Sequence, residues 1–350
     1  MDALAALVVR AAADEFNIDP NNLNLTTTDP ALIKEQRKYC TIDKGCPLEW
    51  ATMQYRPNII GNGVYGIVLA VLLVGQLWFG IRKKTWTYMG AVGSGCLLEI
   101  VGYVGRIMQN RNPFLMRNFL MNLIPLTLAP ALLTAGIYLC LGRVITVVGA
   151  ENSRLKPKLV SIIFVSCDLV SLVLQAIGGA LASIADDKAG SDRGVMIMII
   201  GLISQVISMI LFFGIWGDFA LRARKAKVAG RRCTPPLYEQ LRASKLFHWF
   251  QISLFLATVL IFIRCAYRVA ELWGGFDSHL ANDELTFMIF EGPMIISAVA
   301  FMTVFHPGRV FDDLWVPAGK GVRSMKHLDD SSSSIGLTEG WQDNTAYQRV

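Results

Sequence analysis

Apolar residues gather in seven stretches between residues 59 and 305, and short polar connections separate most of them. Four of the stretches carry no charged residue, and the other three carry one acidic residue each, namely Glu99, Asp168 and Glu291. A helix needs about 20 mainly apolar residues to cross a membrane, and backbone polar groups in lipid must be satisfied within the segment. The pattern predicts an all-α integral membrane protein with seven transmembrane helices, at residues 59–81, 86–105, 119–142, 159–185, 195–217, 247–263 and 285–305.

The polar residues that flank these stretches divide the chain into three parts. Residues 1–57 are predicted to form an extracellular N-terminal segment, and residues 58–307 the seven-helix transmembrane domain. Residues 308–350 have the polar, serine-rich composition of a disordered tail and are expected in the cytosol. No basic region precedes the short apolar run at residues 3–9, so the first transmembrane helix is expected to direct membrane insertion.

Basic residues indicate the orientation of the bundle. One set of connections, at 82–85, 149–158, 218–246 and the start of the tail, carries 18 Lys and Arg residues, whereas 6 lie near the helix ends on the opposite side, namely Lys44, Arg56, Arg111, Arg117, Lys188 and Arg193. Because basic residues concentrate in cytosolic loops, the N-terminus is predicted outside and the C-terminus in the cytosol. The net charge of +6 is therefore interpreted as a topology signal, and no nucleic-acid partner is expected.

The composition favours transport or signalling over catalysis. The chain is 53% hydrophobic and 17% charged, which is typical of integral membrane proteins. It contains no phosphate-binding G-x-x-x-x-G-K-[ST] loop, no G-x-S-x-G, no H-E-x-x-H and no C-x-x-C motif. We therefore expect no enzymatic activity, no cofactor and no metal.

Three residues of the N-terminal segment suggest covalent modification. Cys40 and Cys46 are close in sequence and lie on the predicted oxidising side, so a disulfide between them is expected. Asn24 begins an N-x-[ST] sequence, which predicts a glycosylation site on the same side.

Ionisable residues within the predicted helices are candidate functional residues, because burying a charge in a membrane is costly. Glu99, Tyr103 and Arg106 are spaced by four and three residues, so they share one helix face. At about 1.5 Å per residue, Glu99 and Glu291 reach similar depths. We therefore expect acids and an arginine from different helices to meet in the outer half of the bundle. The same spacing places Arg264, Arg268 and Glu271 on one face of another helix.

Two interpretations of these side chains remain open. They could be ion pairs that fix helix register, or they could line a polar cavity for an amphiphile with a charged head. Arg106 and Glu271, near helix ends, favour the structural interpretation because they could extend to water. Asp168 and Gln175, seven residues apart in the fourth predicted helix, belong to the same candidate set as Glu99 and Glu291.

At these residues the chain resembles the fungal lipid-translocating exporter family, which includes sphingoid long-chain-base exporters and aminocholesterol-resistance proteins. The resemblance covers residues 55 to about 310, and it departs at Met288 and Glu291, where the family commonly has an aromatic residue and Asp. Its motifs, in order, are Glu99-Ile100-Val101-Gly102-Tyr103-Val104-Gly105-Arg106, Leu128-Ala129-Pro130, Tyr138, Leu141-Gly142-Arg143, Asp168, Gln175, Gly178-Gly179, Arg264, Tyr267-Arg268, Glu271 and His306-Pro307-Gly308.

The resemblance implies a plasma-membrane exporter of amphiphilic lipids or toxic lipid-like compounds, which would confer resistance to them. Its partners would be membrane lipids or amphiphilic small molecules, with the charged head near Glu99, Glu291 and Asp168. Acids suit an amine-bearing head and arginines suit a phosphate, so the head group stays open at this point. The alternative is a seven-helix receptor or stress sensor that docks a cytosolic partner at residues 218–246.

Overall fold

The computed structural model of the chain is an all-helical bundle, and it confirms the seven predicted transmembrane helices. Its description covers residues 23–27, 30–51, 53, 55–185, 188–229, 236–274 and 279–320. The spanning helices are α3 Ile59–Arg82, α4 Trp86–Arg111, α5 Met116–Val148, α6 Pro157–Ile184, α7 Lys188–Val228, α9 Lys245–Trp273, and a seventh span made of α10 Glu284–Phe290 and α11 Gly292–Val304.

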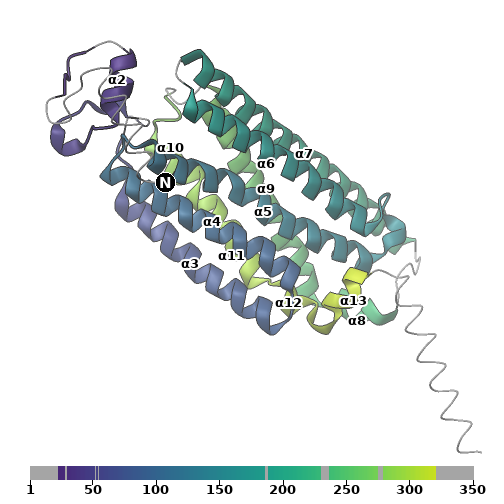
Figure 1. The fold of residues 1–350 in the computed structure, drawn as a ribbon. Coiled ribbons are helices and arrows are strands. Elements are labelled where there is room, and N and C mark those ends of the chain that lie inside the picture. Colours follow the sequence, from purple (N-terminus) through teal and green to yellow (C-terminus); the bar gives the residue numbers. More distant parts are fainter. Residues whose placement is uncertain are drawn as a thin grey trace, which may run out of the picture.

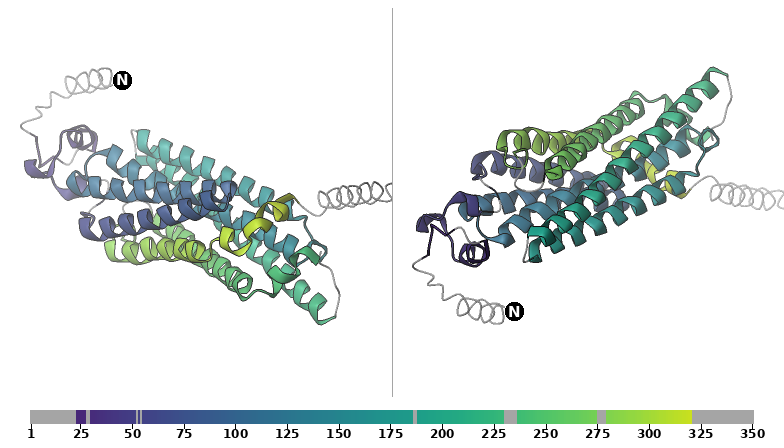
Figure 2. Two further views of the ribbon diagram at one scale, coloured as in Figure 1. Left: turned by 90° about the horizontal axis from the view of Figure 1, so that it is seen from below. Right: turned by 90° about the horizontal axis from the view of Figure 1, so that it is seen from above.

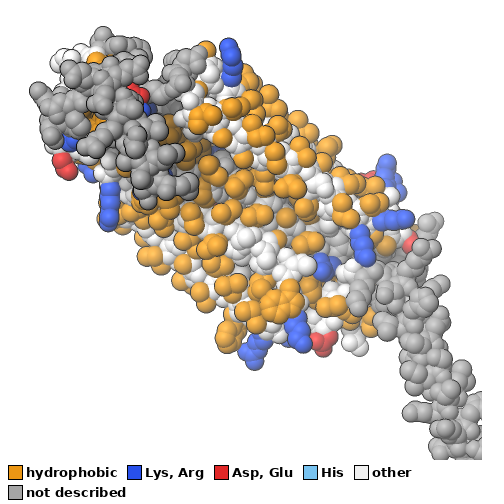
Figure 3. All heavy atoms as spheres, viewed as in Figure 1, with side chains coloured by type: hydrophobic (Ala, Val, Ile, Leu, Met, Phe, Trp, Pro, Cys, Tyr) orange, Lys and Arg blue, Asp and Glu red, His pale blue; other side chains and the backbone are white. Residues whose placement is uncertain are grey.

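The helices run side by side along the length of an elongated molecule (Figures 1 and 2). α5 is the central helix, and 72% of the residues in its apolar 18-residue stretch are buried inside the bundle. α3 and α6 lie at the periphery, because only 17% and 28% of the residues in their corresponding apolar stretches are buried. The remaining apolar side chains of these helices face outward and cover the middle of the molecule, whereas Lys and Arg lie near its two ends (Figure 3). This distribution is the one expected of a protein surrounded by lipid.

Several helices extend beyond their apolar stretches. α4 continues to Arg111, and α7 continues through a basic segment to Val228. The predicted cytosolic connection at 218–246 is therefore partly helical, because α8 (Glu239–Ala243) and the start of α9 occupy its second half. A run of apolar residues identifies only the part of a helix that lipid surrounds. Arg and Lys are good helix formers, so the helix can continue beyond the apolar run.

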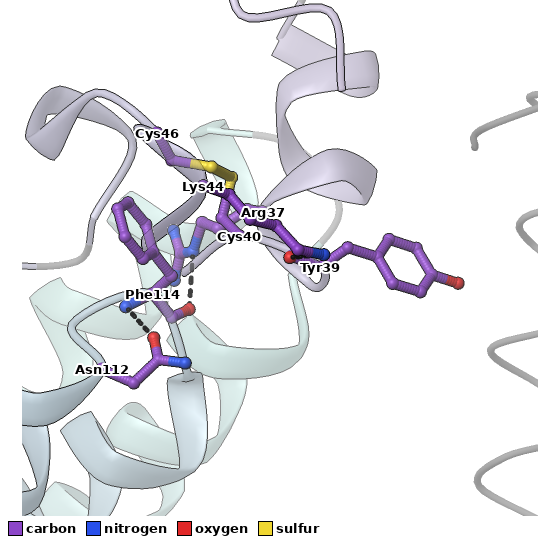
Figure 4. Close-up of a disulfide and its surroundings, with 7 residues drawn as sticks. All are labelled: Arg37, Tyr39, Cys40, Lys44, Cys46, Asn112 and Phe114. Carbon is purple, nitrogen blue, oxygen red and sulfur yellow. Dashed lines mark hydrogen bonds between the residues drawn. A yellow bond between two sulfur atoms is a disulfide. The ribbon is translucent and has the colours of Figure 1, made fainter. Parts of the chain in front are cut away.

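The N-terminal segment packs on one end of the bundle. It contains α2 (Pro30–Arg37) and two short 3-10 helices, η1 (Ile42–Lys44) and η2 (Leu48–Trp50). A disulfide joins Cys40 to Cys46, whose Cα atoms lie 5.9 Å apart (Figure 4). Arg37 Nε donates a hydrogen bond of 3.3 Å to the carbonyl oxygen of Phe114, in the connection between α4 and α5. The segment is thereby held against the bundle.

The disulfide has a direct biochemical test. Cys40 and Cys46 should resist alkylation in the intact protein and should both become reactive after reduction, because a disulfide sulfur has no thiolate to react. Cys167, which is exposed on α6, provides a comparison thiol for the solubilised protein. Alkylation of Cys40 or Cys46 without reduction would contradict the assignment.

Asn24 supplies a test of orientation. Its side chain is exposed, and its Oδ1 accepts hydrogen bonds from the backbone N–H and the hydroxyl of Thr26. We expect a glycosidase to increase the gel mobility of the protein, and Asn24→Gln to produce the same shift. A protein whose mobility changes in neither case would contradict an N-terminus exposed to the glycosylation machinery.

The C-terminal part begins with ordered helices, which differs from the tail predicted from residue 308. α12 (Pro307–Val310), η5 (Asp312–Leu314) and α13 (Trp315–Lys320) pack at the end of the bundle opposite the N-terminal segment (Figures 1 and 2). Phe311 and Trp315 are buried, and the Arg143 guanidinium lies 3.6 Å from the centre of the Trp315 ring. The buried rings of Phe311 and Trp315 explain why this part of the chain forms packed helices, because burying large rings offsets the conformational entropy that is lost when the chain is fixed. Residues 321–350 lie outside the described residues.

Candidate functional site

The seventh span is broken at Glu291. α10 ends at Phe290 and α11 begins at Gly292, because Pro293 lacks the N–H that would continue the helical hydrogen bonds. The hydroxyl of Tyr65 donates a hydrogen bond of 2.9 Å to the Met288 carbonyl beside the break. A Cβ at Gly292 would lie 2.3 Å from the Tyr65 ring, so only glycine allows this close approach. The break places the Glu291 carboxylate inside the bundle, where it is fully buried.

Arg264 of α9 is the ion-pair partner of Glu291. Its Nε donates a hydrogen bond of 3.0 Å to Glu291 Oε1, and its Nη2 also contacts that oxygen. Nη2 donates a further hydrogen bond to the carbonyl of Leu126 in α5. That carbonyl is available because Pro130, four residues later, has no N–H to donate to it. Two prolines therefore determine the partners of Arg264. Pro293 breaks the helix at Glu291, and Pro130 leaves the Leu126 carbonyl free to accept from Arg264.

A second ion pair lies one turn of α9 further on. Arg268 Nη1 is 2.5 Å from Glu271 Oε2, and both side chains are buried. They line a cavity of about 10 Å³ together with Met53 of the N-terminal segment and Asn122 of α5. A cavity of this size has room for about one water molecule. The N-terminal segment thus covers this end of the site.

Arg106 is buried as well, which corrects the expectation that Arg106 and Glu271 extend to water. Its Nη2 donates a hydrogen bond of 2.7 Å to the hydroxyl of Tyr55, and its guanidinium lies 3.6 Å from the centre of the Phe287 ring. Burial raises the pKa of the Tyr55 hydroxyl, so that group is neutral at physiological pH. Met53, Tyr55 and Phe287 of α10 cover these helix ends, and this coverage excludes the water that snorkelling would require.

Glu99 lies beside these ion pairs without joining one. It is fully buried, and neither of its carboxyl oxygens has a hydrogen-bond partner among the described residues. It interacts electrostatically with Arg264, Arg268 and Glu291. Because α4 extends to Arg111, Glu99 lies near the midpoint of its helix rather than in the outer half. Tyr103, one turn along, is buried too, and its ring meets that of Tyr65 edge-on at 5.7 Å.

The structure therefore gathers seven of the nine candidate substrate-binding residues into one group, which we call the ionisable cluster. Its members come from α4, α9 and the break between α10 and α11. They are Glu99, Tyr103, Arg106, Arg264, Arg268, Glu271 and Glu291.

Asp168 and Gln175 lie outside the cluster. One carboxyl oxygen of Asp168 accepts hydrogen bonds of 3.0 Å from the hydroxyls of Thr134 and Tyr138 in α5. Its other oxygen is buried without a partner in the described structure. Gln175 instead donates a hydrogen bond of 3.1 Å to Gln205, which joins α6 to α7. The expected meeting of Asp168 with Glu99 and Glu291 at one head group is not observed as a direct contact.

Three partners of the cluster were missed by sequence reasoning. They are the Tyr55 hydroxyl, the Phe287 ring and the Leu126 carbonyl. The Leu126 carbonyl could have been found, since a proline four residues downstream always leaves a carbonyl without its helical donor. Tyr55 and Phe287 lie in segments with no periodic signal that points toward Arg106.

Buried ion pairs and unpartnered carboxyl groups among seven membrane-length helices define a polytopic membrane protein with a charged interior. Within the described ranges, no group of three His, Cys, Asp or Glu side chains could hold a metal ion. Comparison with known protein families identifies the family to which this membrane protein belongs. The chain belongs to the RTA1-like family, because the family model described as "RTA1 like protein" matches residues 92–313, which include the whole ionisable cluster.

Curated relatives from Saccharomyces cerevisiae support this assignment. The chain is 34% identical over 316 residues to the sphingoid long-chain base transporter RSB1 of strain Lalvin EC1118, covering 82% of this chain and 81% of that protein. It is 33% identical over 223 residues to protoporphyrin uptake protein 1, covering 63% and 69%. It is 29% identical over 221 residues to protein RTM1, covering 62% and 67%. No solved structure matches the chain.

Proposed function

We propose that this chain is a transporter that moves amphiphilic lipids with a cationic head, such as sphingoid long-chain bases, across the membrane. The observation that carries the proposal is Glu99, a buried carboxyl group without a partner in the described structure at the middle of a seven-helix bundle. The similarity to a sphingoid long-chain base transporter over 82% of the chain supports the same substrate class. In the proposal, the protein acts at the plasma membrane and confers resistance to such compounds.

The partners of the ionisable groups favour an amine over a phosphate. Arg264 and Arg268 are each engaged by a carboxylate, and Arg106 by a hydroxyl and an aromatic ring. Among the described residues, Arg106 and Arg268 also keep nitrogen atoms without a hydrogen-bond partner, but each arginine has at least one engaged nitrogen, whereas Glu99 has no hydrogen bond at either oxygen and Asp168 lacks one at Oδ1. The interior therefore offers acceptors without a basic partner, and an ammonium group supplies the charge and donors that such acceptors need.

The described conformation is closed around the ionisable cluster. Glu99 is fully buried, and the cavity beside Arg268 and Glu271 holds only about one water molecule, so a lipid head can reach Glu99 only after helices separate. The break at Glu291 is the natural hinge, because Pro293 cannot donate the helical hydrogen bond that would otherwise resist bending there. In this scheme the two ion pairs fix helix register and Glu99 receives the substrate.

A signalling function is the second candidate. α7 projects four basic residues beyond its apolar stretch, at Arg222, Arg224, Lys225 and Lys227, in the region expected to dock a cytosolic partner. The same residues would also suit anionic lipid. A receptor would require a partner protein for its effect, whereas a transporter would act alone.

Reconstitution separates these functions. Purified protein in vesicles should accelerate the crossing of a fluorescent long-chain amine above the rate in protein-free vesicles, measured as protection from an impermeant quencher. Equal rates in the two kinds of vesicle would contradict the transporter proposal. Capture of a cytosolic protein that depends on residues 218–246 would then favour the receptor.

A further inference from the structure

Glu99 is surrounded by ionisable groups that already have other partners or carry no charge. From α9, Arg264 and Arg268 interact with it electrostatically, and each forms an ion pair with another acid. From the helix break, Glu291 also interacts with it, but Glu291 is held by Arg264. On α4 itself, Cys96 and Tyr103 interact with Glu99 electrostatically. Among the residues that the structure describes, no basic group is therefore committed to neutralising Glu99.

The charges of the cluster leave Glu99 as its unmatched acid. Removing the two ion pairs leaves Glu99 and Arg106. These two residues lie seven positions apart on α4, which corresponds to roughly 10.5 Å along the helix axis. Arg106 is turned to Tyr55 and Phe287 at the covered end of the bundle. Burying an isolated carboxylate costs several kcal/mol, so a bound proton is the simplest way to neutralise Glu99 in the closed conformation.

We propose that Glu99 exchanges a proton for the ammonium head of the substrate, so that the protein is an antiporter of protons and cationic amphiphiles. This inference rests on the proposed function. The geometry favours such exchange because a proton and an ammonium group each bring one positive charge to the same carboxyl group. The ion pairs on α9 need not rearrange to compensate for either ligand.

The exchange balances in atoms and charge. With the site open to one side, the O–H bond of the Glu99 carboxylic acid breaks and the proton passes to water. The ammonium head then binds the carboxylate by charge-assisted hydrogen bonds. With the site open to the other side, the ammonium leaves and a proton from water re-forms the O–H bond. One positive charge moves in each direction, so no net charge crosses the membrane.

The test uses the full-length protein in vesicles whose interior is one pH unit more acidic than the medium, with the membrane potential clamped at zero. The probe is a fluorescent long-chain amphiphile with a guanidinium head, which has N–H donors for the Glu99 carboxylate and stays charged, so that it cannot cross as a neutral amine. One-to-one exchange predicts about tenfold accumulation of the probe in the inner leaflet, because tenfold in concentration balances one pH unit. A dye in the lumen should report matching proton loss.

Three substitutions test whether Glu99 is the residue that exchanges the proton for the cationic head. Glu99→Gln resembles the protonated acid and should fold, but it should show neither accumulation nor proton loss. Glu99→Asp keeps a carboxyl group and should retain accumulation, which separates the role of the acid from a packing role. Glu151→Gln, the same chemical change at an exposed residue, should behave as the unaltered protein.

Three results would overturn the proposal. Probe that distributes equally between leaflets despite the gradient shows transport without exchange, and the proposed function then stands alone. Crossing of the primary long-chain amine without crossing of the guanidinium probe excludes the cation as the transported species, because the guanidinium probe is always charged and still has N–H donors. Failure of both probes to cross overturns the proposed function together with this inference.

Discussion

Arg264→Met alone is expected to destabilise the protein by about 3–5 kcal/mol, which is the usual consequence of removing one member of a buried ion pair. The substitution leaves Glu291 as a buried charge without its partner and leaves the Leu126 carbonyl without its donor. Thermal unfolding of the solubilised protein should show a large loss of stability, and little folded protein should reach the membrane.

The double variant Arg264→Met with Glu291→Met should recover most of that loss. Replacing both members of a buried pair by apolar groups of similar volume removes the uncompensated charge. Arg154→Met is the control, because Arg154 is 70% exposed where it pairs with Asp218, and exposed pairs contribute only about 0–1 kcal/mol. A single Arg264→Met variant as stable as this control would contradict a structural role for the pair.

Glu99→Gln is expected to abolish resistance to a toxic long-chain amine while leaving the amount of protein at the cell surface unchanged. Glutamine preserves the size of the side chain and removes its ability to become negatively charged when the substrate binds. A hydrogen bond to a charged group contributes roughly 1.5–3 kcal/mol, so substrate binding should weaken by at least about tenfold. Surface abundance and amine export should be measured on the same cells, with Glu151→Gln as the matched control.

The outcome of this substitution separates the two interpretations of Glu99. Reduced abundance together with reduced thermal stability would assign Glu99 a structural role like that of Arg264. Normal abundance with normal export would contradict both roles.

The sequence predicted the spanning helices because lipid imposes a simple rule on length and apolarity. It also predicted that Glu99, Arg264 and Glu291 come close together, because rise per residue and helix direction determine depth. Depth alone could not predict which acid pairs with Arg264. That choice depends on the helix break at Pro293, which places Glu291 within reach of Arg264 and leaves Glu99 without a hydrogen-bond partner in the described part of the chain.

Two of the predictions were wrong for the same physical reason, which is that side chains from segments distant in the sequence pack over the residues concerned. Arg106 was expected to reach water, but Tyr55 of the N-terminal segment and Phe287 cover it. The tail was expected to begin at residue 308, but Phe311 and Trp315 fix the following residues against the bundle. Neither contact is periodic in sequence, so neither could be read from hydrophobic pattern or charge.

A structure of the protein in a lipid bilayer with a bound long-chain amine would show whether Glu99 receives the cationic head of an amphiphile. We expect density for the ammonium head within hydrogen-bonding distance of the Glu99 carboxylate, with the acyl chain directed outward between helices and the Arg264–Glu291 pair intact. Density for the head at another place, with Glu99 still enclosed as in the closed conformation, would contradict the proposal.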